Sequence, residues 1–142
     1  MNYKEAIRKL EQLKTQIATI TGNEMVNFAL DNIRAGSWEG QRWQPRDAKA
    51  RRNAGRALLV DTGRGRRSID DKITGDQVKL VAEEYMVAHN EGVKKTVSVR
   101  GGKRKAHTRH MNLPQRQFTG ESDRQTERIN KIIANRIVQS LT

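Results

Sequence analysis

The pattern that most constrains the fold is an apolar stripe near the C-terminal end of the sequence. Between residues 122 and 141, large aliphatic residues recur at spacings of three and four, which is typical of an amphipathic helix. The stripe consists of Ile129, Ile132, Ile133, Ile137, Val138 and Leu141. Ser122 is a good N-cap residue, and Gln125 three positions later completes a capping-box pattern. The sequence therefore predicts a C-terminal helix that packs through this stripe.

Two further helices are predicted in the N-terminal part of the chain, over residues 1–35. Apolar residues recur with helical spacing over 3–20 and again over 24–35. Thr21-Gly22-Asn23 lies between these stretches and predicts a break, because glycine and asparagine are frequent where helices end. Gly36 predicts the end of the second helix.

The middle of the chain favours short strands. Three stretches alternate polar and apolar residues in the way that half-buried strands do: 68–74, 77–82 and 94–100. Thr74-Gly75-Asp76 predicts a turn between the first two, and residues 84–90 suit a short helix that ends at Gly92. We therefore expect one α+β domain over 1–142, with N-terminal helices and a C-terminal helix packed on a small, mostly antiparallel sheet.

Two stretches are expected to be mobile basic loops or arms, over 36–57 and 100–113. Both combine glycine with many charges and show no helical apolar periodicity. Trp38 and Trp43 lie in the first stretch, where a tryptophan either anchors the loop on the core or contacts a partner. The short apolar segment 57–60 is expected to be buried.

The positive charge is concentrated in two segments. The 142 residues include 28 Lys and Arg against 16 Asp and Glu, for a net charge of +12. Residues 46–67 hold eight basic and two acidic residues, and residues 94–116 hold eight basic residues and no acidic one. The rest of the chain is therefore almost neutral. The residues expected to face a partner or DNA are Arg51, Arg52, Arg56, Arg64, Arg66, Arg67, Lys103, Arg104, Lys105 and Arg109.

Three interpretations of these basic segments are compatible with the sequence. They could contact nucleic-acid phosphates, bind an acidic protein surface, or simply remain solvated. Aromatic residues are only 4% of the chain, and none lies in 94–116. Stacking on bases is therefore poorly supported, which favours contacts with phosphates alone or with an acidic protein.

No catalytic, cofactor or metal site is predicted. His107 and His110 are surrounded by cations, which repel a metal ion, and Asp61–Ser68 matches neither common phosphate-loop pattern. The adjacent carboxylates Asp70-Asp71 and Glu83-Glu84 would point to opposite faces of a strand. We therefore expect a protein that is not an enzyme.

Membrane and secreted classes are also disfavoured. No run approaches the roughly 18 apolar residues of a membrane helix. The N-terminus lacks the apolar stretch of a signal peptide, and there is no cysteine to form a disulfide. We expect a cytosolic origin, with later incorporation into an assembled particle possible.

Three stretches together resemble a known family. The first joins Trp43-Gln44-Pro45-Arg46 through a basic linker to 58–69 (LLVDTGRGRRSI), and the second is 85–92 (YMVAHNEG). The third is 113–120 (LPQRQFTG), which precedes the amphipathic C-terminal helix. In this order they resemble the phage virion morphogenesis family, the Mu-like tail completion or head–tail joining proteins. The resemblance covers about 43–142. Gly65 departs from the family, which usually has a large apolar residue there, so a looser turn is expected.

The motif residues have structural interpretations. Asp61 and Thr62 can cap a helix, and Gly63 and Gly92 suit turns. We expect Tyr85 to bury its ring. We expect the side chains of His89 and Asn90 to form hydrogen bonds with neighbouring backbone. Pro114 and Phe118 are expected to fix the last extended segment before the C-terminal helix.

The resemblance implies a structural protein of the virion neck or tail end. It implies a ring, expected to be a hexamer, that links the tail to the connector, with connector, neck, tail tube or tail terminator proteins as neighbours. Non-specific contact with passing DNA is compatible with this role, and assembly would occur in the host cytoplasm. No cofactor is implied. The alternative is a small basic module that binds nucleic acid through sequence-independent phosphate contacts.

Overall fold

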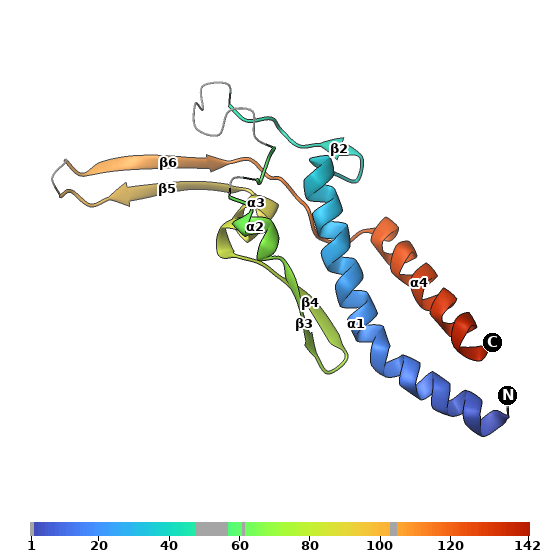
Figure 1. Cartoon of the computed structure of the whole chain (residues 1–142). Helices are drawn as coiled ribbons and strands as arrows, with labels where there is room; N and C mark the ends of the chain where they lie inside the picture. The colour runs from blue at the N-terminus through green and yellow to red at the C-terminus, as the bar shows by residue number, and fades with distance from the viewer. Residues whose placement is uncertain (1, 48–56, 61, 103–104) are drawn as a thin grey trace.

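The computed structural model describes residues 2–47, 57–60, 62–102 and 105–142. Within these ranges, four helices and three antiparallel strand pairs form an α+β fold, as predicted. Figure 1 shows the long helix α1 (Tyr3–Ala35) beside the C-terminal helix α4 (Asp123–Leu141). A ribbon made of β5 (Val93–Val99) and β6 (His107–Leu113) extends away from both helices.

Helix α1 is one continuous helix, so the predicted break at Thr21-Gly22-Asn23 is wrong. The helix begins after Asn2, whose Oδ1 accepts a hydrogen bond from Glu5 N at 2.9 Å, and it ends at Gly36, as predicted. Gly22 is buried within it, and a Cβ at that position would collide with the carboxylate of Asp71. The glycine therefore permits a close approach by another element, and one glycine costs a long helix only about 1 kcal/mol.

The strands form three separate two-stranded pairs within the described ranges. The shortest pairs β1 (Ser37–Trp38) with β2 (Gln41–Arg42). The second pairs β3 (Asp70–Thr74) with β4 (Gln77–Val81), close to the predicted bounds. Its turn contains Gly75 at φ +58°, a left-handed conformation that glycine adopts without strain. Two short helices, α2 (Arg64–Arg67) and α3 (Glu84–Glu91), flank this pair in the chain.

Both stretches that we expected to be loops contain strands. β1 and β2 lie within 36–57, and β6 lies within 100–113. β6 pairs with β5 along its whole length, from Val93 opposite Leu113 to Val99 opposite His107. Six of the seven β6 residues are exposed. The strand therefore lacks the alternation of polar and apolar residues from which a strand can be predicted. Residues 48–56 and 103–104 of the expected loops lie outside the described residues.

The core lies where α1, α3 and the segment before α4 meet. Phe118 and Met86 are its largest fully buried side chains. They pack with Ala29, Ile33, Trp43 and Ile69. Residues 58–60 are half-buried against this cluster and Ala57 is exposed, so the segment 57–60 is less buried than predicted. Between β6 and α4, residues 114–120 form an extended segment, which we call the strap.

Helix α4 begins as its capping pattern predicts, because Ser122 Oγ accepts a hydrogen bond from Gln125 N at 3.2 Å. None of its residues, all of which are described, is fully buried. The apolar stripe is half-buried from Ile129 to Ile137, and Val138 is 62% exposed. Apolar packing alone therefore fixes this helix only in part.

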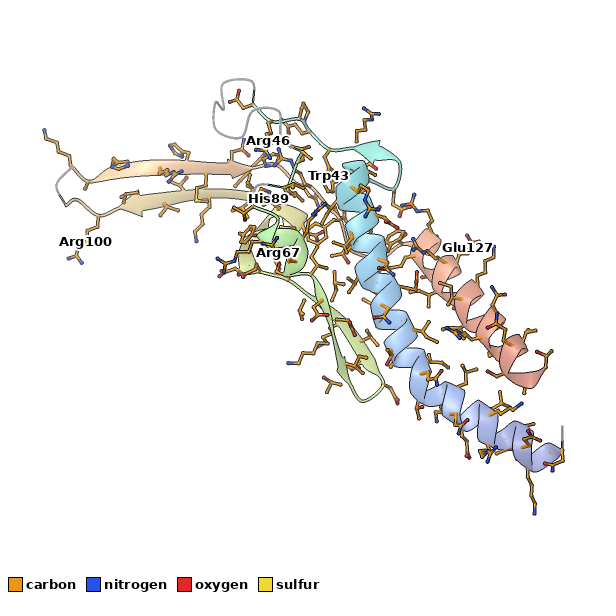
Figure 2. The ribbon with its side chains drawn as sticks, in the orientation of Figure 1. Trp43, Arg46, Arg67, His89, Arg100 and Glu127 are labelled. Atoms are coloured by element: carbon orange, nitrogen blue, oxygen red, sulfur yellow. The ribbon has the colours of Figure 1, made fainter. Side chains whose placement is uncertain are left out.

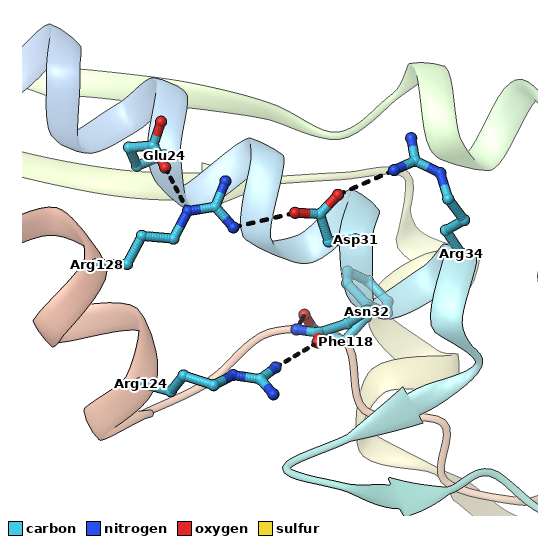
Figure 3. A network of polar contacts seen from close by, with 7 residues as sticks. All are labelled: Glu24, Asp31, Asn32, Arg34, Phe118, Arg124 and Arg128. Carbon is cyan, nitrogen blue, oxygen red and sulfur yellow. Dashed lines mark hydrogen bonds and ion pairs between the residues drawn. The ribbon is translucent and has the colours of Figure 1, made fainter. Parts of the chain in front are cut away.

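Arginine side chains complete the attachment of α4 to α1 (Figure 3). Arg128 forms ion pairs with Glu24, at 2.8 Å from Nε to Oε2, and with Asp31, at 3.0 Å from Nη1 to Oδ2. One turn earlier, Arg124 Nη2 donates to Asn32 Oδ1 at 3.2 Å. The buried amide of Asn32 in turn donates through Nδ2 to the carbonyl oxygen of Phe118 at 3.2 Å. One asparagine thus connects α1, the strap and α4.

We expect Asn32→Leu to lower the free energy of unfolding by about 2 kcal/mol. The substitution keeps the number and branching of the side-chain heavy atoms but leaves the buried carbonyl oxygen of Phe118 without its donor. Urea unfolding measures the loss. Asn135→Leu makes the same change on the exposed side of α4 and should stay within about 0.5 kcal/mol of the wild type. Equal losses in the two variants would contradict the role assigned to Asn32.

Candidate functional site

The strap joins the motif residues that lie far apart in the sequence. At its start, Arg116 N donates to the carbonyl oxygen of His89 at 2.7 Å. Asn90 Oδ1 accepts hydrogen bonds from two successive strap amides, Phe118 N at 2.9 Å and Thr119 N at 3.1 Å. The end of α3 therefore holds the strap at three backbone atoms, and the side chain of Asn90 bonds to backbone as expected.

The opposite side of the strap is held by Trp43, which is 8% exposed. Its Nε1 donates to the carbonyl oxygen of Gln117 at 2.8 Å, so the ring fills the core while its polar edge is satisfied. Phe118 is 1% exposed, and Pro114 is half-buried. Trp43 thus anchors the chain after β2 to the strap within this chain.

The turn before α2 brings this short helix close to α3. Gly63 is the N-cap residue of α2, at φ +77°. Arg64 N donates a long hydrogen bond of 3.4 Å to Thr62 Oγ1. Gly65 is buried, and a Cβ there would lie 2.5 Å from Met86 Sδ. The missing side chain lets α2 approach α3 closely, and the looser turn expected relative to the family stays a prediction. Asp61 lies outside the described residues.

Helix α3 differs from the expectation at two positions. Tyr85 is 45% exposed, and Met86 is the residue that points into the core, so the predicted burial of the tyrosine ring is wrong. His89 is half-buried, but its Nδ1 has no hydrogen-bond partner, unlike the backbone contact that we expected. Burial lowers the pKa of His89, and the charges of Arg116 and Arg46 lower it further.

Gly92 ends α3 at φ +74°, where its amide donates to the carbonyl oxygen of Ala88 at 2.9 Å. A Cβ at this position would lie 3.0 Å from the backbone nitrogen of Gln115 in the strap. The glycine is therefore needed both for its conformation and for the close passage of the strap.

The described basic residues do not form one patch. Arg64 is exposed but pairs with Glu83, at 2.8 Å from Nη2 to Oε1, whereas Arg66 and Arg67 are exposed on α2. Lys105 is exposed just before β6, and Arg109 is exposed within β6. Figure 2 shows Arg100 at the tip of the ribbon and Arg67 near its base. The remaining candidates lie outside the described residues: Arg51, Arg52, Arg56, Lys103 and Arg104.

The two histidines that lie close together in the sequence, His107 and His110, do not form a shared metal site. His107 and His110 are three residues apart on β6, so they face opposite sides of the ribbon. Among the described residues, no three histidine, cysteine or acidic side chains come together as metal ligands. The helices found in the same ranges are all too short or too polar to cross a membrane.

The sequence profile of the phage virion morphogenesis family matches residues 3–138. The chain belongs to the phage virion morphogenesis family. The match includes α1, which the three motifs alone did not cover. No curated protein and no solved structure matches the chain. Membership makes this a structural component of the phage virion, in a family that is not known for enzymes.

Sequence reasoning missed the polar residues that hold this family member together. Asn32 follows Phe28 by four positions and Ala29 by three, so a polar residue on the buried face of α1 was the available signal. Ser68 was missed as well. Its Oγ donates to the carbonyl oxygen of Gly65 at 2.7 Å and accepts from Glu83 N at 3.1 Å.

The lowered pKa of His89 predicts a pH dependence of stability. The unfolded chain takes up a proton near the ordinary histidine pKa of about 6.5, whereas the folded protein resists it, so stability falls as the pH falls through that value. We expect the urea midpoint to decrease between pH 7 and pH 5, and His89→Gln to remove part of that decrease. His110→Gln, on the exposed ribbon, is the control. Identical pH profiles for both variants and the wild type would exclude this assignment.

Proposed function

We propose that the protein completes the phage tail by forming a ring at its head-proximal end, where it links the tail to the connector. The observation that supports this most is the β5–β6 ribbon. Within the described ranges it pairs with no other strand, so the backbone donors and acceptors on both of its outer edges are available. A free two-stranded ribbon is marginally stable in water and is a ready template for pairing with another chain.

The charge distribution favours contact between copies of the chain. The ribbon segment 94–116 has no acidic residue, whereas residues 68–93 contain six acidic residues against Lys72 and Lys79. These acidic residues lie on or beside the β3–β4 pair and α3, away from the ribbon tip (Figure 1). A basic ribbon of one subunit laid over the acidic elements of the next gives a head-to-tail contact, and such contacts form a ring when the rotation between subunits closes.

The same ribbon suits the other neighbours expected at this position. Basic side chains on a ring can contact acidic surfaces of connector, neck, tail tube or tail terminator proteins. They can also face DNA that passes through the ring, which requires phosphate contacts without sequence readout. A hexamer is the subunit number that we propose for the ring.

Shortening the ribbon tests the proposal. Thr96 faces His110 in the ladder, so residues 97–109 can be replaced by an Asn-Gly turn without disturbing the base of the ribbon. We expect the wild type to form a discrete ring in light scattering and electron microscopy, and the shortened variant to remain monomeric with a similar urea midpoint. A control with Lys4→Gln removes a positive charge from α1 and should assemble normally. A wild type that stays monomeric, or a shortened variant that still forms rings, would refute the proposal.

A second candidate function is supported by the exposed lysines and arginines of the ribbon segment. A nucleic-acid-binding module would bind duplex DNA as a monomer or dimer, with affinity that falls steeply as salt rises. The logarithm of the binding constant should then fall by about 0.9 per phosphate contact for each tenfold rise in salt. Fluorescence anisotropy with a short duplex measures this slope. Micromolar binding by a monomer at physiological salt would favour this module over the ring, and we expect weaker binding.

A further inference from the structure

A cleft of about 1,020 Å³ opens between residues 44–47 and the base of the β5–β6 ribbon. Its walls include the apolar side chains of Val93, Leu113 and Pro114, and the strap forms one side of it. A smaller cavity of about 230 Å³ lies next to it and shares two residues with it, Arg46 and Arg116. The two arginines therefore lie between the cleft and the interior of the domain.

Three nitrogen atoms at this place are buried and without a hydrogen-bond partner. They are Nε of Arg46, Nε of Arg116 and Nδ1 of His89. Arg116 is only 7% exposed, and among the described residues its side chain forms a single hydrogen bond, from Nη2 to the carbonyl oxygen of Gln44, which is long at 3.4 Å. Arg46 donates through Nη2 to the carbonyl oxygen of Ala57 at 2.9 Å. Each guanidinium thus uses little of its donor capacity.

No ion pair within the described ranges joins Arg46 or Arg116 to a carboxylate. Asp47, Glu91 and Lys94 also line the cleft. A guanidinium keeps its charge in a protein, and a buried charge without a counter-ion is costly. Burial and the neighbouring Arg46 lower the pKa of Arg116, which reflects this cost in the folded state. Within the described residues, the charge of Arg116 is therefore not neutralised by an ion pair.

We propose that Arg116 and Arg46 bind a carboxylate of another protein chain that enters this cleft. The preferred ligand is an acidic side chain on an extended segment with apolar neighbours, because Val93, Leu113 and Pro114 form an apolar part of the cleft and the guanidinium of Arg116 can donate two parallel hydrogen bonds. A carboxylate on a flexible side chain can reach a guanidinium that is 7% exposed, whereas the broad, stiff backbone of duplex DNA cannot. The cleft includes the base of the ribbon, but the inference rests on Arg46 and Arg116 and does not require ring formation.

The test uses a capped pentapeptide of sequence Ala-Val-Glu-Val-Ala and its glutamine counterpart, at millimolar concentrations. Nuclear magnetic resonance follows the Nε–H signal of Arg116 and the ring signals of His89 in the full chain. We expect the glutamate peptide to shift these signals in a saturable way, and the glutamine peptide to leave them in place. Absence of a saturable shift, or equal shifts with both peptides, would overturn the proposal.

Variants separate a binding role from a structural one. Arg116→Met should raise the dissociation constant of the glutamate peptide at least about tenfold while the melting temperature stays the same or rises, because an unpaired buried charge is removed. Arg100→Met removes one charge from the ribbon tip and should change binding less than twofold. A large fall in the melting temperature of Arg116→Met would show that the arginine is structural.

A short DNA duplex provides the last arm of the experiment. We expect it to leave the Arg116 signal in place, since the guanidinium is recessed in the cleft. A saturable shift with DNA that matches or exceeds the one with the glutamate peptide would identify a phosphate site and contradict the proposal. Because Arg116 and His89 are observed directly, DNA bound elsewhere on the basic ribbon does not affect this outcome.

Discussion

The fold depends on the hydrogen bonds that hold the strap across the core. Asn90 accepts hydrogen bonds from two amides of the strap. Trp43 donates a hydrogen bond to one carbonyl oxygen of the strap, and Asn32 donates to another. These partners come from α3, from the chain after β2 and from α1, so the strap ties all three to the element that leads into α4. Buried backbone groups must be paired, and an extended segment cannot pair its own. The fully buried ring of Phe118 fixes its register.

The sequence predicted the elements whose pattern reflects burial on one side. The capped helix from Ser122 and the β3–β4 pair follow from periodicity and turn chemistry, because each has one apolar face. β6 could not be found in this way, since a strand that faces solvent on both sides carries no alternation. The helix break predicted at Gly22 was wrong for a related reason. Its role is to admit Asp71 of β3, a tertiary contact that local sequence does not encode.

The residues of the candidate site also fall into those that the sequence could predict and those that it could not. Asn90 and Gly92 were identifiable because their chemistry acts locally, through an amide side chain and a left-handed backbone. Tyr85 was assigned to the core in error, because α3 is too short for its apolar residues to define a face, and its rotation is set by the contact of Met86 with Gly65. Arg116 also needed the structure, since a basic residue in a basic segment gives no sign that it is buried.

The net charge of +12 therefore has two different physical meanings in one chain. On the ribbon, positive side chains are solvated, so their cost is small and they can attract a partner over a distance of about a Debye length. At Arg116 the charge is buried in the fold without a carboxylate partner in the described residues, and the cost is borne by the free subunit. A partner that supplies the missing carboxylate would recover that cost only on binding. The isolated subunit is then less stable than the assembled one, because a partner that binds only the folded state raises the free energy of unfolding.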